Sequence, residues 1–293
     1  MHISREITQN ARAFLSRLNG AFKCPEPLLD PVERRGTSFV RESFLRLTGY
    51  EHVPKAKVIY ATSQDDAVKE VRRKPDHMFF HSERHPEIRV SPDGLDYGVT
   101  AKSRSIIVAV DQIFTSSRSV ETSLFFLARG FIHERTHEAN EDRWLGEKAG
   151  KIYASALWRA VGSRGIPMLR NAEDFGQWHS GLASSVFYTP QEAKSLALAR
   201  LVDEGLASRM EWLLRTAALH GVEPDPDAFA EDELRRIKRP SYYSAAKFIE
   251  RLENSLGQNA AWKMIGQELP ASFQEIRRPE LFIERVKGII ENF

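Results

Sequence analysis

Apolar residues recur every three or four positions along most of the chain, which is the spacing of one face of an α-helix. The broadest stripe covers residues 118–140 and suits deep burial; it comprises Val120, Leu124, Phe125, Leu127, Ala128, Phe131 and Ile132. Further helices are predicted at about 3–22, 38–47, 65–71, 144–161, 190–220, 241–256, 258–268 and 279–289. The pattern therefore predicts a mostly helical protein.

Residues 77–114 have a different texture from the helical stretches around them. Residues 105–110 form a continuous apolar run bounded by charges, which predicts a buried strand. Shorter strands are predicted at 58–60, 77–81 and 87–90. These segments predict a small mixed sheet and an α+β fold class.

The predicted elements divide the chain into three parts. An N-terminal helical segment (1–54) precedes a subdomain that holds the sheet and the helix at 118–140 (55–140). A C-terminal helical subdomain (141–293) follows, and a long loop is predicted at 162–188.

Composition and charge mainly exclude classes of protein. The chain has 293 residues, 42% of them hydrophobic and 28% charged, and a formal net charge of +2, so no overall field favours nucleic acid or an anionic membrane. No apolar run approaches the roughly 20 residues that a membrane span needs, and no secretory signal is expected. Cys24 is the one cysteine. These features predict a soluble cytoplasmic protein without nucleic-acid or membrane partners.

The candidate chemistry lies at the C-terminal end of the helix predicted at 118–140, where residues 133–137 read His-Glu-Arg-Thr-His. On a helix the four-residue spacing places His133 and His137 on one face, one turn apart, so both imidazoles can bind one metal ion. Glu134 lies beside them and can take a proton from a metal-bound water. The alternative is that both histidines are ordinary polar residues of a helix.

A catalytic zinc site normally has three protein ligands. Asn140 and Arg143 stand where the metzincin motif has Gly and His, so the third ligand is expected elsewhere. Glu204 is the best candidate, because a carboxylate among apolar neighbours on a helix is costly to bury unless it is paired or ligating. Asp203 is the alternative, either as the ligand or as a carboxylate that orients a ligand histidine. Gly205 costs a helix roughly 1 kcal/mol against alanine, which close approach to another helix or to the metal would explain.

The combination of His133-Glu134-x-x-His137 with a helix carrying Asp203-Glu204-Gly205-Leu206-Ala207 resembles the gluzincin branch of the zincin metallopeptidases. The resemblance covers residues 56–270 and implies a divergent or compact zincin-like fold. It implies that His133, His137 and Glu204 bind Zn²⁺ and that Glu134 is the general base. It also implies that the strand at 105–110 is the edge strand along which an extended substrate pairs.

The same resemblance implies a tyrosine beyond the glutamate helix that stabilises the oxyanion. Tyr243 is the candidate, with Tyr242 as its alternative, while packing at a helix start is the competing interpretation. A second metal site at His77, His81 and His85 is disfavoured, because the surrounding residues predict extended structure.

Together these features predict a zinc metallopeptidase that acts on a peptide or protein substrate. Two alternatives stay open: a hydrolase of the same fold that cleaves a non-peptide amide or ester, and a non-catalytic helical binding protein with a chance His-Glu-x-x-His.

Overall fold

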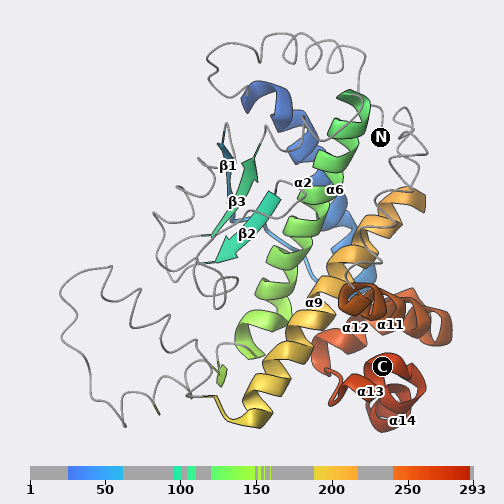
Figure 1. The fold of residues 1–293 in the computed structure, drawn as a ribbon. Coiled ribbons are helices and arrows are strands. Elements are labelled where there is room, and N and C mark those ends of the chain that lie inside the picture. Colours follow the sequence, from blue (N-terminus) through green and yellow to red (C-terminus); the bar gives the residue numbers. More distant parts are fainter. Residues whose placement is uncertain are drawn as a thin grey trace.

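The computed structural model describes residues 26–61, 95–99, 104–109, 120–148, 151–152, 155, 159, 188–216 and 240–290. Within these ranges the protein is α+β and mostly helical, as predicted (Figure 1). The strands are β1 (Lys57–Ala61), β2 (Leu95–Val99) and β3 (Arg104–Ala109). The helices are α2 (Glu26–Thr48), α6 (Val120–Asn140), the π-helix η2 (Glu141–Leu145), α9 (Pro190–Thr216), α11 (Pro240–Leu256), α12 (Gln258–Gln267), α13 (Phe273–Arg277) and α14 (Pro279–Ile290).

Several predictions fall on residues outside these ranges. They are the helices at 3–22 and 65–71, the strands at 77–81 and 87–90, the loop up to residue 187, Cys24, and the three histidines His77, His81 and His85. The predicted helix at 38–47 is the C-terminal half of α2, which begins earlier, at Glu26.

The three strands form a mixed sheet in the order β1-β3-β2. β1 pairs with β3 in parallel, with Val58 opposite Ile106, and β2 pairs with β3 antiparallel, with Tyr97 opposite Ile106. The strand predicted at 105–110 is therefore confirmed, but its expected place at the edge of the sheet is wrong. Its continuous apolar run suits a central strand, because Ile106, Ile107 and Val108 are all fully buried.

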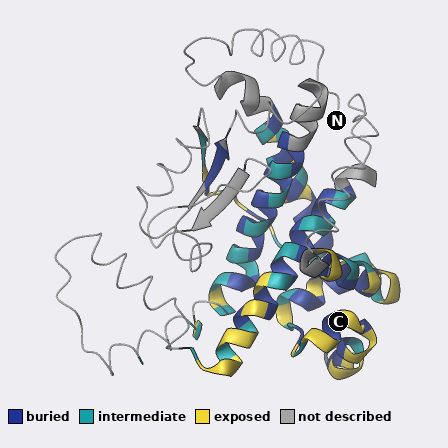
Figure 2. Cartoon of the chain, in the orientation of Figure 1, coloured by how far each residue is buried: buried dark blue, intermediate teal, exposed yellow. Residues whose placement is uncertain are grey.

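Helix α6 lies at the centre of the described structure (Figure 1), with β2 and α2 against it and α9 packed beside it. α11 packs on the far side of α9, and α12 contacts α2. Figure 2 shows buried positions along α6 and α9 and exposed ones on the outer faces of the C-terminal helices. The largest fully buried side chains in this core are Trp262, Phe44, Phe131, Phe248 and Phe282. None of the described helices combines the length and the apolar character required to cross a membrane.

The N-terminus of α9 is held by the capping box that its sequence predicts. Thr189 Oγ1 accepts a hydrogen bond from the backbone N–H of Glu192 at 3.2 Å, and a Glu192 carboxylate oxygen accepts from the backbone N–H of Thr189 at 2.8 Å. Pro190 occupies the first helical position, where its missing N–H is not needed. The start of the helix that carries Glu204 is thus specified locally.

Gly205 marks a close approach between α9 and α11. A Cβ placed on Gly205 would lie 2.8 Å from both the backbone carbonyl carbon and the Cβ of Ala245. Of the two explanations that the sequence allows for this glycine, the structure supports contact with another helix. The contact brings α11 against α9 one residue from Glu204.

We expect Gly205→Ala to lower the free energy of unfolding by about 1–3 kcal/mol, because the new methyl must push two packed backbones apart. The matched control is Gly288→Ala in α14, where a Cβ would meet nothing within 4 Å. There the better helix propensity of alanine should stabilise the protein by up to about 1 kcal/mol. Urea unfolding of both variants measures this, and equal effects at the two positions would contradict the close approach.

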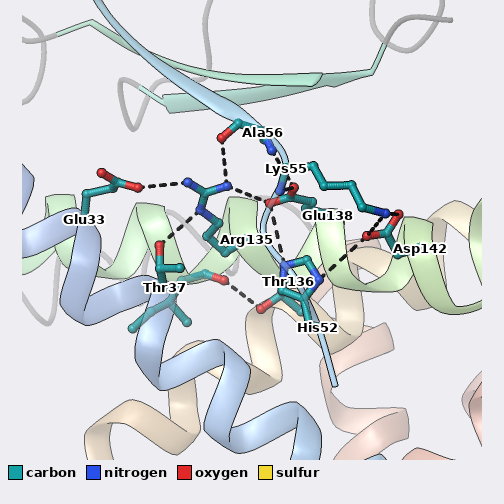
Figure 3. A network of polar contacts seen from close by, with 10 residues as sticks. Glu33, Thr37, His52, Lys55, Ala56, Arg135, Thr136, Glu138 and Asp142 are labelled. Carbon is teal, nitrogen blue, oxygen red and sulfur yellow. Dashed lines mark hydrogen bonds and ion pairs between the residues drawn. The ribbon is translucent and has the colours of Figure 1, made fainter. Parts of the chain in front are cut away.

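A network of charged side chains lies on the face of α6 that is turned toward α2 and the segment before β1 (Figure 3). Arg135 donates to Glu138 at 2.7 Å, to Glu33 at 2.9 Å and to the carbonyl oxygen of Ala56 at 3.1 Å. The other oxygen of Glu138 accepts from the backbone N–H groups of Lys55 and Ala56 at 2.5 and 2.6 Å. Arg135, within the His-Glu-Arg-Thr-His segment, and Glu138, directly after it, therefore join α2 and the segment before β1 to α6.

Burial alone raises the pKa of Glu138, but His52, Arg135 and the backbone of Lys55 outweigh it and lower the pKa from 4.5 to about 2. A carboxyl group with a lowered pKa stabilises the folded state above pH 4.5 and loses that contribution as the pH falls toward 2. The difference corresponds to about 3 kcal/mol.

We expect Glu138→Gln to be less stable than wild type by about 3 kcal/mol at pH 7, with a gap that narrows as the pH falls below 4.5. Urea unfolding between pH 7 and pH 3 measures the gap. Glu284→Gln, at an exposed position of α14, is the control and should match wild type throughout. A gap of constant size at every pH would show that the charge of Glu138 does not contribute.

Candidate metal centre

His133 and His137 project from adjacent turns of α6 toward α9. Their ring centroids are 4.7 Å apart and the ring planes are inclined by 78°. Both side chains remain partly exposed, at 20% and 12%. The helix therefore presents two imidazoles side by side, as the four-residue spacing predicts.

Helix α9 places Glu204 opposite both rings. One Glu204 carboxylate oxygen lies 3.3 Å from Nε2 of His133 and 3.7 Å from Nε2 of His137. Ligand atoms of the three residues all lie within 4.8 Å of one another, and this is the group among the described residues that could hold a metal ion. The structure thus brings together the three predicted ligands, although Glu204 lies 67 and 71 residues after the two histidines in the sequence.

The same three residues have the donor chemistry of a zinc site. Two imidazole nitrogens and one carboxylate oxygen are the protein ligands of many catalytic zinc ions, which keep a further position for water or substrate. All three side chains remain partly exposed among the described residues. The residues present therefore fit the predicted ion.

Each histidine is held by a second carboxylate on its other ring nitrogen. Nδ1 of His137 lies 2.7 Å from Asp203 Oδ2, and Nδ1 of His133 lies 2.6 Å from Glu211 Oε1. Because an ionised carboxylate only accepts hydrogen bonds, each Nδ1 is the donor, and Nε2 is the nitrogen directed at Glu204. Asp203 thus contacts Nδ1 of His137, the nitrogen that an orienting carboxylate would contact, while Glu204 faces Nε2 of both rings.

The Asp203 carboxylate is itself fixed from α6 and the π-helix after it. Asn140 Nδ2 donates to Asp203 Oδ1 at 2.7 Å, and Asn140 Oδ1 accepts from Trp144 Nε1 at 3.3 Å. Trp144 is a buried residue of η2. π-helical turns often occur beside functional sites. Here Trp144 of η2 is the last member of a series of hydrogen bonds that runs through Asn140 and Asp203 to His137.

Negative charge dominates the surroundings of the two imidazoles. Burial alone lowers the pKa of His137, but Asp203 and Glu204 outweigh it and raise the pKa to about 9. Burial likewise opposes protonation of His133, yet Glu204 and Glu211 raise its pKa well above 6.5. Without a metal the site therefore attracts protons, and a bound cation would take their place.

Glu134, the predicted general base, lies on α6 between the two histidines and is 8% exposed. Tyr243, the predicted oxyanion donor, lies in the first turn of α11, two residues before the Ala245 contact with Gly205. Its ring is 5.8 Å from Nζ of Lys247 and its side chain is 40% exposed. The side chain of Tyr242 lies outside the described residues. The oxyanion role stays a prediction.

The sequence analysis missed Glu211, Arg129 and Asn140. A signal for Glu211 does exist, because it follows Glu204 by seven residues and therefore returns to the same face of α9 after two turns. Arg129 similarly precedes His133 by one turn of α6. The sequence positions of Arg129 and Glu211 do not show that the two side chains contact each other, because that contact depends on how α6 and α9 pack.

The chain was also compared with known proteins, and no family model, curated protein or solved structure matches it.

Proposed function

We propose that this protein is a zinc-dependent metallopeptidase with a zincin-like fold of the gluzincin type. The observation that carries the proposal is the convergence of His133, His137 and Glu204, with ligand atoms within 4.8 Å, beside Glu134 on the same helix. Two imidazoles and one carboxylate favour zinc over the hard cations Mg²⁺ and Ca²⁺, which prefer all-oxygen sites.

The chain's own residues have separate tasks in this proposal. A zinc ion bound by the three ligands supplies Lewis-acid chemistry, which polarises a substrate carbonyl and acidifies water. Glu134 accepts the proton of the attacking water and returns it to the leaving amine as the peptide bond breaks. Asp203 holds the His137 imidazole in the tautomer that leaves Nε2 available.

The surrounding sequence supports a cytoplasmic enzyme with a peptide or protein substrate. The net charge of +2 gives no reason to expect nucleic acid, and the lone Cys24 suits a reducing compartment. Tyr243 is a candidate donor to the oxyanion, which Tyr243→Phe would test by its effect on turnover.

Two measurements on purified protein test the proposal. Elemental analysis should find close to one zinc per chain, and a peptide library should be cleaved by the zinc-loaded protein but not after chelation. Restoration of cleavage by added zinc completes the test. Zinc-loaded protein that cleaves esters or non-peptide amides but no peptide would redirect the proposal to that class of hydrolase. Protein that binds no zinc would refute it.

A further inference from the structure

Arg129 and Glu211 form a buried ion pair directly behind the metal centre. Arg129 belongs to α6 and Glu211 to α9, and each is 6% exposed. Arg129 Nε donates to Glu211 Oε2 at 2.9 Å, and a second guanidinium nitrogen contacts the same oxygen. The other oxygen, Oε1, accepts from Nδ1 of His133 at 2.6 Å. One carboxylate thus connects a guanidinium to a predicted ligand.

The protein offers a comparison for this pair between α9 and α11. Arg209 Nε donates to Glu253 Oε2 at 2.7 Å, and Glu253 Oε1 accepts from Trp262 Nε1 at 2.7 Å. Glu253 is buried to a similar degree, at 8% exposure. Both pairs join α9 to a neighbouring helix, but one leads to a histidine of the metal centre and the other to a core tryptophan.

The carboxylates that contact the two histidines have partners of different charge. The Asp203 carboxylate behind His137 accepts from the neutral amide of Asn140, whereas the Glu211 carboxylate behind His133 is paired with a guanidinium. Two guanidinium nitrogens contact Oε2 of Glu211 while Nδ1 of His133 contacts Oε1, so both carboxylate oxygens are held. A fixed carboxylate in turn restricts rotation of the His133 ring.

We propose that Arg129 and Glu211 are positioning residues for the metal centre, which hold His133 with Nδ1 protonated and Nε2 directed at the ion. The proposal rests on the proposed function, because it requires that His133 binds a metal. It assigns Arg129 and Glu211 a role in metal affinity in addition to joining α6 and α9. Loss of such an outer partner typically lowers metal affinity about 10- to 100-fold.

The test compares zinc affinity, measured by competition with a chromophoric chelator, in matched variants. We expect Glu211→Gln and Arg129→Met to weaken zinc binding about 10- to 100-fold. Glu253→Gln and Arg209→Met remove the comparison pair and should bind zinc within about twofold of wild type. Arg129→Lys keeps the charge but not the planar fork, and should fall between wild type and Arg129→Met.

Two further measurements separate positioning from stability. The visible spectrum of the Co²⁺-substituted protein should change in Glu211→Gln but not in Glu253→Gln, since only the former alters the geometry of a ligand. In zinc-loaded wild type, ¹⁵N NMR of His133 should show a protonated Nδ1. This wild-type measurement decides the proposal even if Glu211→Gln does not fold.

The outcomes distinguish this proposal from the one it rests on. Wild-type protein that fails to bind zinc would overturn both. Wild type that binds zinc, with unchanged affinity and cobalt spectrum in Glu211→Gln, would overturn the positioning role alone. An unprotonated Nδ1 on His133 in the zinc-loaded protein would do the same.

Discussion

Glu134→Gln should abolish most peptide hydrolysis while leaving zinc bound. Glutamine has nearly the shape of glutamate but cannot accept the proton of the attacking water, so turnover should fall by about 10²- to 10⁴-fold. Zinc content should stay near that of wild type, because Glu134 is beside the ligands His133 and His137 and is not one of them in the proposed site. Steady-state kinetics on a cleaved peptide, together with elemental analysis, measures both effects.

The control for this prediction is Glu284→Gln, the same substitution at an exposed site of α14, which should leave turnover unchanged. If Glu134→Gln also lost its zinc, the defect would lie in metal binding and the variant would not test the base. If it kept both zinc and full turnover, Glu134 would not be the base, and a different group would have to accept the proton.

Glu204→Ala should have the largest effect on metal binding. The substitution removes the carboxylate proposed as the oxygen ligand, one oxygen of which lies 3.3 and 3.7 Å from the two Nε2 atoms. Its loss should weaken zinc binding by more than the 10- to 100-fold expected for an outer partner. Asp203→Asn, on the adjacent residue, is the matched comparison, because Asp203 contacts Nδ1 of His137 and not the position of the metal.

Thermal unfolding provides a second measure of the same variant. A ligand present at 1,000 times its Kd stabilises the folded state by about 4 kcal/mol, so excess zinc should raise the melting temperature of wild type. The rise should be smaller in Asp203→Asn and smallest in Glu204→Ala at the same zinc concentration. Equal rises in Glu204→Ala and wild type would show that Glu204 is not a ligand.

The elements that carry the site could be predicted because their signals are local. The stripe from Val120 to Ile132 predicts α6, and Thr189 with Glu192 predicts the start of α9. The same reasoning did not assign β2, whose Asp96 and Gly98 are poor strand formers. Nor did it predict the π-helix η2, since one extra residue in a helical turn leaves almost no trace in the periodicity.

The position of β3 in the sheet shows where a family resemblance and a local pattern lead to different expectations. The resemblance implied an edge strand at 105–110, whereas the structure places β3 between β1 and β2. The continuous run of Ile106, Ile107 and Val108 is typical of a strand covered on both faces, and all three are buried. Strand order depends on pairing between segments distant in the chain, which the apolar run alone does not specify.

The sequence by itself determined which residues can bind a metal and that two of them share one helix face. The four-residue spacing of His133 and His137 is enough for that, because helical geometry converts spacing directly into direction. The tertiary structure decided that Glu204 faces Nε2 of both rings, and that Asp203 and Glu211 take the two Nδ1 atoms. These contacts span 66 to 78 residues and depend on the rotation of α9 against α6. The tertiary structure also showed that Gly205 allows Ala245 of α11 to pack closely on α9.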